Sequence, residues 1–145
     1  MSHAVKGKTN FTEEHTDILI EALKEAYEGC TIERNTQVNI RGRPMCDIVV
    51  KRRHGNEIGF RLNHETKNYE CHAYEPGYMD SQQSINRALE PVYEPYFRGT
   101  TKKMMKQSPV LNSYIMGQTQ DIEKNGKKMK RIRLTPGASG GGGWI

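Results

Sequence analysis

The middle of the chain, residues 31–74, reads TIERNTQVNIRGRPMCDIVVKRRHGNEIGFRLNHETKNYECHAY. It contains four short runs of strand-like composition, at 31–40, 46–52, 57–62 and 69–74. Short polar segments rich in glycine, asparagine and proline separate these runs and are typical of turns. Because the connections are short, they favour an antiparallel meander over crossover connections. The residues expected to face the core, unless their alternates do, are Val38, Ile40, Ile48, Val50, Ile58, Phe60, Tyr69 and Cys71.

The segment before this meander predicts a helix preceded by an arm, residues 1–11. Thr12 is a suitable N-cap, and acidic residues follow it near the positive end of the helix dipole. Apolar residues then recur at steps of three and four up to Tyr27, and Gly29 is a suitable stop. The sequence therefore predicts a helix that starts at Thr12 and ends before Gly29.

The segment after the meander predicts a second helical region, from about Ser81 to Gln107. Its apolar residues recur with helical spacing, but Pro91 and Pro95 fall inside it. Proline removes a helix hydrogen bond and clashes with the preceding turn. We therefore expect this region to be bent or interrupted rather than one straight helix.

A hairpin is predicted to close the domain. Two strand-like runs, 113–122 and 127–134, flank Asn125-Gly126, a strong signal for a type I′ turn. The predicted fold class is α+β, with an N-terminal helix, an antiparallel four-strand meander, a second helical region and a closing β-hairpin. We expect one domain over residues 1–135 and a flexible, glycine-rich tail over 136–145.

Size and composition exclude several classes of protein. The chain has 145 residues, 34% of them hydrophobic, and no apolar run approaches the ~18 residues of a membrane span. No basic and apolar leader opens it, so we expect a cytoplasmic protein that contacts no membrane. The three cysteines lie far apart, without a Cys-x-x-Cys pair, which indicates reduced structural thiols. We expect no metal site and no cofactor.

The basic residues concentrate near the C-terminus. Residues 101–135 hold nine Lys and Arg against two acidic residues, while residues 1–100 hold thirteen against fifteen. Such a block can bind the phosphates of a nucleic acid, bind an acidic protein surface, or form a solvated face with no partner. The candidate contact residues are Lys124, Lys127, Lys128, Lys130, Arg131 and Arg133.

Several motifs of the body resemble a family of conserved hypothetical proteins from plastids and cyanobacteria. The shared features are the start Met1-Ser2-His3, the first helix, the segments 38–42, 47–50, 58–60 and 69–70, and the later helix rich in Gln and Tyr. The resemblance covers roughly residues 1–134. Because these are motifs of sheet and turn, the resemblance implies a fold and does not imply an activity.

The tail departs from that family and resembles the end of a ubiquitin-like modifier precursor in its layout. Four glycines, Gly140, Gly141, Gly142 and Gly143, precede Trp144 and Ile145. Glycines suit a thin, extended segment, because a narrow channel admits backbone where a Cβ would clash. The resemblance implies a peptidase that removes Trp144-Ile145, an adenylating enzyme that activates Gly143, and a conjugating enzyme. The order of elements in the body differs from the β-grasp order of such modifiers, which begins with a hairpin.

Other interpretations of the chain remain open. The tail is alternatively a flexible linker, or a docking peptide whose terminal Trp-Ile fills a partner's pocket. The body is alternatively a small adaptor, or a nucleic-acid-binding module that uses the basic hairpin. We do not expect an enzyme, because the sequence has no nucleophile elbow, P-loop or paired-histidine motif.

Overall fold

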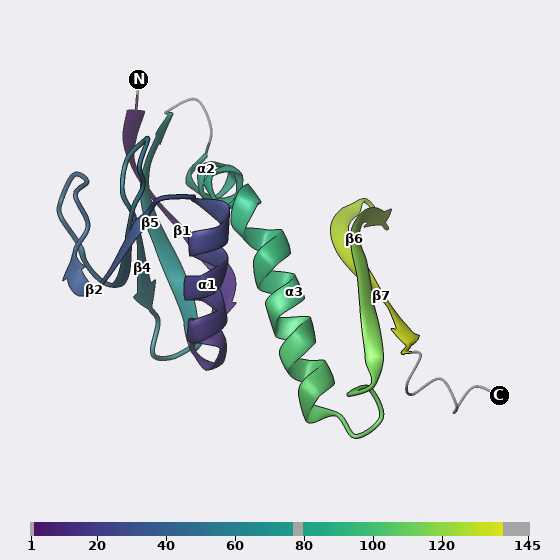
Figure 1. The fold of residues 1–145 in the computed structure, drawn as a ribbon. Coiled ribbons are helices and arrows are strands. Elements are labelled where there is room, and N and C mark those ends of the chain that lie inside the picture. The colour runs from purple at the N-terminus through teal and green to yellow at the C-terminus, as the bar shows by residue number, and fades with distance from the viewer. Residues whose placement is uncertain (1, 77–79, 138–145) are drawn as a thin grey trace. The chain divides into compact units, whose positions relative to one another are not determined.

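A computed structural model describes residues 2–76 and 80–137 (Figure 1). The chain groups into two compact units, Met1–Tyr93 and Glu94–Ile145. The single domain that the sequence predicts over residues 1–135 includes residues of both units. Helix α3 (Glu90–Gln107) begins in the first unit and continues into the second.

The first unit is an antiparallel sheet with helices, which confirms the α+β class. Its five strands lie in the order β1-β5-β4-β3-β2, and each neighbouring pair is antiparallel. The elements in chain order are β1 (Ser2–Thr12), a 3₁₀-helix (Glu13–His15), α1 (Thr16–Ala26), β2 (Thr31–Gln37), β3 (Met45–Lys51), β4 (Ile58–Leu62), β5 (Asn68–Pro76) and α2 (Ser81–Ala88).

The predicted four-strand meander is present as β2 to β5, but the sheet has a fifth strand, so the expected number was wrong. Residues 2–11, part of the segment 1–11 that was expected to be an arm, form most of β1 and pair with β5. The residues of β1 that are buried are Val5, Gly7, Thr9 and Phe11. Since glycine and threonine fill two of these four positions, the alternation of apolar and polar residues that identifies a strand is missing from the sequence.

The start of the first helix also differs from the prediction. A 3₁₀ turn separates Thr12 from α1, and the Thr12 side chain makes no capping hydrogen bond. At this end of the helix the Thr16 hydroxyl makes the hydrogen bonds: it donates to the Glu13 carbonyl at 2.7 Å and lies 2.7 Å from the Tyr69 hydroxyl. The helix therefore begins four residues later, at the point where it reaches β5.

The second helical region is interrupted, as expected, but the break falls before the prolines. Helix α2 ends at Ala88, and α3 begins at Glu90 with Pro91 in its first turn, where proline is tolerated. Pro95 lies inside α3. Asp80 caps α2 by accepting a hydrogen bond from the Gln83 amide at 2.9 Å, and the helix begins at Ser81, where the sequence predicts it.

Helices α1 and α2 cover one face of the sheet, where the main core lies (Figure 1). Tyr27, which follows α1, donates its hydroxyl proton to the Ala88 carbonyl at the end of α2. Phe11 packs between strand and helix, with ring centroids 6.0 Å from Phe60 and 5.8 Å from Tyr93. All eight residues predicted for the core are buried.

A smaller apolar cluster lies where the β2–β3 connection folds back. Val38 and Ile40 come after the end of β2 and pack with Cys46 and Val49, next to Ala4 and Tyr74. Gly59 of β4 makes room for this packing, because a Cβ there would lie 2.6 Å from the Cys46 sulfur. The predicted strand 31–40 therefore ends early, at Gln37, because its last apolar residues belong to this cluster.

Candidate nucleic-acid interface

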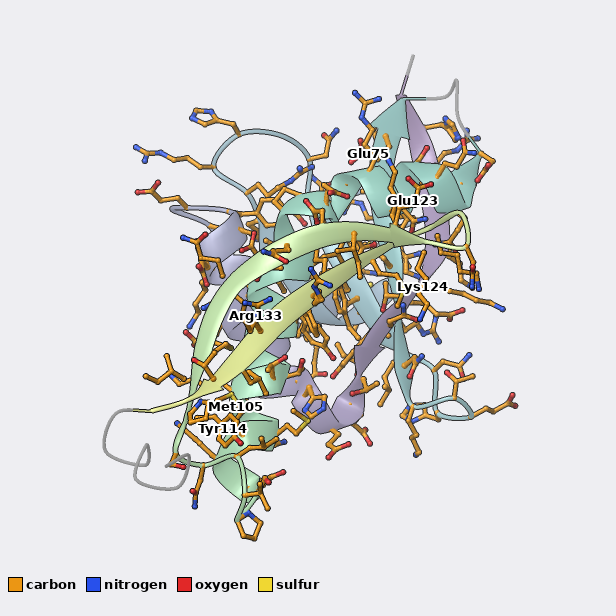
Figure 2. The ribbon with its side chains drawn as sticks, turned by 90° about the vertical axis from the view of Figure 1, so that its right-hand side faces the viewer. Glu75, Met105, Tyr114, Glu123, Lys124 and Arg133 are labelled. Atoms are coloured by element: carbon orange, nitrogen blue, oxygen red, sulfur yellow. The ribbon has the colours of Figure 1, made fainter. Side chains whose placement is uncertain are left out.

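The second unit contains a two-stranded antiparallel ribbon, formed by β6 (Tyr114–Lys124) and β7 (Lys127–Pro136). Asn125 and Gly126 connect the strands with φ values of 54° and 76°, and both signs match the predicted type I′ turn. Figure 2 shows the ribbon as a long curved pair of strands, with Lys124 next to the turn. The predicted closing hairpin is thus confirmed, and each strand is longer than expected.

The pairing register divides the ribbon's side chains between two faces. We call the first the outer face; all but one of its residues are exposed, and they are Ile115, Gln120, Ile122, Lys124, Lys127, Met129, Arg131, Arg133 and Thr135. We call the second the inner face; six of its nine residues are half-buried, and they are Tyr114, Met116, Thr119, Asp121, Glu123, Lys128, Lys130, Ile132 and Leu134.

The two faces differ in charge. Four basic residues and no acidic residue lie on the outer face. Both acidic residues of the ribbon lie on the inner face, where each is opposite a lysine: Asp121 pairs with Lys130 and Glu123 with Lys128. The inner face is therefore neutral overall, and the outer face carries the ribbon's whole net charge of +4.

Direct contacts follow the same division. On the inner face, Lys130 Nζ and Asp121 Oδ1 are 2.8 Å apart. On the outer face, Arg131 Nη2 donates to Gln120 Oε1 at 2.8 Å, a contact that leaves the arginine charge uncompensated. Lys124 and Lys127 stand directly opposite each other beside the turn, a like-charge pair that opposes strand pairing.

Arg98 of α3 holds the base of the ribbon. Its Nη1 donates to the Gly117 carbonyl at 2.7 Å and to the Thr119 hydroxyl at 3.3 Å. The register shifts by one residue between Met116 and Thr119, so this bond satisfies backbone at a β-bulge. Because Thr119 belongs to the inner face, the bond orients that face toward α3 and the basic outer face toward solvent.

The structure brings together four of the six basic residues predicted as contacts. Lys124, Lys127, Arg131 and Arg133 share the outer face, whereas Lys128 and Lys130 belong to the inner one. Gln120 of the outer face was missed, because the predicted contact residues are all basic. The residues predicted for processing and conjugation, Gly140, Gly141, Gly142, Gly143, Trp144 and Ile145, lie outside the described residues.

The carboxylates of the sheet that lie beside β3 and β4 have backbone partners. Asp47 Oδ2 accepts a hydrogen bond from the Leu62 amide at 2.7 Å, and Glu57 Oε1 accepts one from the Asn39 amide at 2.9 Å. These bonds continue the strand pairing and fasten the β2–β3 connection. Their roles are therefore structural.

Several titratable groups of the first unit have perturbed pKa values. Burial raises the pKa of the Cys46 thiol to about 11, and the charge of Asp47 adds to the effect. Burial also raises the pKa of Cys71, so both buried thiols stay protonated at neutral pH. Burial, together with nearby Lys6, lowers the pKa of His72, whose Nε2 is buried without a hydrogen-bond partner.

Over residues 2–76 and 80–137, no three His, Cys, Asp or Glu side chains are grouped so that they could hold a metal ion. In the same part of the chain, no helix is both long and apolar enough to cross a membrane. Comparisons with protein-family models, with curated proteins and with solved structures find no match for the chain.

Proposed function

We propose that the chain binds nucleic acid through the outer face of the β6–β7 ribbon. The observation that supports this most is the separation of charge: four basic and no acidic side chains on the exposed face, with both acids on the other. A merely soluble surface mixes the two signs, because interspersed charges lower the repulsion. Here the repulsion between Lys124 and Lys127 is retained on the face that a polyanion would neutralise.

The division of charge between the two units also supports nucleic-acid binding by the second unit. Residues 1–93 hold twelve Lys and Arg against fourteen acidic residues, and residues 94–145 hold ten against three. A basic field confined to one part of a chain attracts phosphates to that part alone. Binding is therefore expected to depend on the second unit.

The strength of the effect follows from counterion release. Each phosphate contact on B-form DNA contributes about −0.9 to the slope of log K against log salt, so four contacts give a slope of about −3.6. Between 50 and 200 mM salt the affinity would then fall by about 100-fold. A surface that meets a protein partner through apolar contacts has no comparable salt dependence.

The experiment compares two double variants of the full chain by fluorescence anisotropy with a labelled 20-bp DNA duplex. Arg131→Gln with Arg133→Gln removes two charges from the outer face. Lys128→Gln with Lys130→Gln removes two charges from the inner face of the same strand, so the net charge of the two variants is equal. Circular dichroism checks that both remain folded.

We expect the outer variant to bind at least tenfold more weakly, with a salt slope reduced by about 1 to 2, and the inner variant to change little. Equal losses in the two variants would mean that net charge alone matters and would remove the ribbon face as the site. The absence of binding by the unmodified chain at 50 mM salt would end the proposal itself.

The interpretation as a conjugated modifier stays a prediction, because its residues follow the last described one, Gly137. Its test is the intact mass of the chain after co-expression with the proteins encoded beside its gene. A product that ends at Gly143, with heavier adducts that disappear on Gly143→Glu, would support it. An unchanged mass with every neighbouring protein would leave the tail as a linker or a docking peptide.

A further inference from the structure

We infer that the ligand of the ribbon is duplex DNA in the B form, and that the ribbon enters its major groove with the outer face toward the base edges. This inference rests on the proposed nucleic-acid binding and specifies its ligand. It depends on the width of the ribbon, on the absence of aromatic side chains from the outer face, and on the pair formed by Arg131 and Gln120.

The shape of the ribbon suits the major groove of undistorted B-DNA. Two paired strands lie about 4.8 Å apart, and a two-stranded ribbon fits the major groove of B-DNA, which is about 12 Å wide. The minor groove is about 6 Å wide and admits paired strands only when the protein widens it or bends the duplex. In an RNA duplex the major groove is deep and narrow and excludes such an element.

The side chains of the outer face do not suit single strands. Proteins that bind single strands stack the bases on aromatic rings. The one aromatic residue of β6 and β7, Tyr114, belongs to the inner face and is half-buried. The outer face therefore offers charge and hydrogen bonds, but no ring on which a base could stack.

The middle of the outer face has the chemistry that reads base edges. Arginine pairs with the O6 and N7 acceptors of guanine, and glutamine with N6 and N7 of adenine. Arg131 and Gln120 stand opposite each other and are joined by the 2.8 Å hydrogen bond, which orders both side chains. The exposed Met129, with 48% of its surface accessible, is two residues from Arg131 and is placed to contact a thymine methyl group.

The remaining basic residues are placed at the two ends of the face. Lys124 and Lys127 flank the turn, and Arg133 lies opposite the bulge near the base of the ribbon. From Lys127 to Arg133 the strand advances about 20 Å, at roughly 3.3 Å per residue. This distance spans about six base pairs, so the end residues reach phosphates while Arg131 lies over the bases between them.

The test uses the full chain and four probes of 20 nucleotides per strand. They are a DNA duplex, one of its single strands, an RNA duplex of the same sequence, and the DNA duplex with 7-deazaguanine in place of guanine. The deaza base lacks the N7 acceptor of the major groove but leaves charge and pairing intact. A fifth duplex with inosine for guanine lacks only the amino group of the minor groove, and it is the matched control.

We expect the unmodified DNA duplex to bind at least tenfold more tightly than the single strand or the RNA duplex. The deaza duplex should bind about three- to tenfold more weakly than the unmodified one, since half of each bidentate contact is lost. Inosine should have no effect. Arg131→Lys should reduce the deaza effect with an unchanged salt slope, because lysine keeps the charge but lacks the planar fork of the guanidinium, whereas Arg133→Lys should preserve the effect.

The outcomes separate this inference from the proposed function. Equal binding of all five probes would overturn the major-groove inference and leave nucleic-acid binding intact. A loss with inosine but not with the deaza base would place the ribbon in the minor groove and would also overturn it. Binding to none of the probes at 50 mM salt would overturn both.

Discussion

The smaller apolar cluster at the β2–β3 connection, which Gly59 of β4 contacts, yields a quantitative prediction. A Cβ at this position would lie 2.6 Å from the Cys46 sulfur and 3.1 Å from the Val38 Cβ. The backbone φ of Gly59 is not among the positive values, so alanine can adopt it, and the reduced entropy of the unfolded chain favours the variant by about 0.4–1 kcal/mol. Overpacking of a buried site costs about 1–3 kcal/mol. We therefore expect Gly59→Ala to destabilise the first unit by about 1–2 kcal/mol.

The contact with the sulfur is isolated by a double-mutant cycle. Cys46→Ala alone should cost about 1 kcal/mol, because it leaves a small cavity. In that background Gly59→Ala should be nearly neutral, since the nearest atom is gone and only the longer contacts with Val38, at 3.1 and 3.2 Å, remain. The coupling energy is then about 1–2 kcal/mol, well above the ~0.5 kcal/mol expected of independent sites.

The assay is urea unfolding of the full chain followed by circular dichroism. Reaction of the Cys71 thiol with a thiol reagent reports on the first unit alone, because that thiol is fully buried in the folded state. Equal costs of Gly59→Ala in the two backgrounds would refute the reasoning, since the steric conflict would then not involve the sulfur. A stabilised single variant would show that the cluster has room for a methyl group.

Three further predictions concern charged and buried polar groups. Because the pKa of His72 is lowered in the folded protein, the unfolded chain takes up a proton first as the pH falls. The free energy of unfolding should therefore decline below about pH 6.5, and urea melts at pH 5 to 7 should show a smaller decline for His72→Gln. The raised pKa of Cys46 means that the unfolded thiol ionises first, so stability should fall from about pH 8.5 towards 11, with a shallower slope in Cys46→Ala. Arg98→Ala should weaken the ribbon by about 1.5–3 kcal/mol, because the bonds to Gly117 and Thr119 are lost, and amide exchange in β6 should report it.

The sequence predicts the fold well where local chemistry decides the structure. The Asn125-Gly126 turn is identifiable from two residues, since both require positive φ and few other pairs tolerate it. The strands around Ile48 and Phe60 are identifiable because apolar residues alternate there. The extra strand β1 cannot be identified from the sequence, because Gly7 and Thr9 occupy buried positions that are usually apolar.

The two faces of the ribbon can be predicted from the sequence, although the candidate contacts given above do not separate the basic residues by face. A two-residue turn pairs Lys124 with Lys127, and each step back along β6 then meets one step forward along β7. Since side chains alternate in strands, this register alone places Lys128 and Lys130 with the two acidic residues. The four unopposed charges follow directly from it.

The direction in which those charges point depends on tertiary structure. A two-stranded ribbon has no core of its own, and either face can turn toward water. The Arg98 hydrogen bonds to Gly117 and Thr119 decide this, because they attach the inner face to α3 at the bulge. Arg98 is thus a positioning residue for the proposed interface: its removal should weaken DNA binding by loosening the ribbon. Because it lies outside the contact surface, the salt slope should stay the same, whereas Arg133→Gln should lower that slope by about 1.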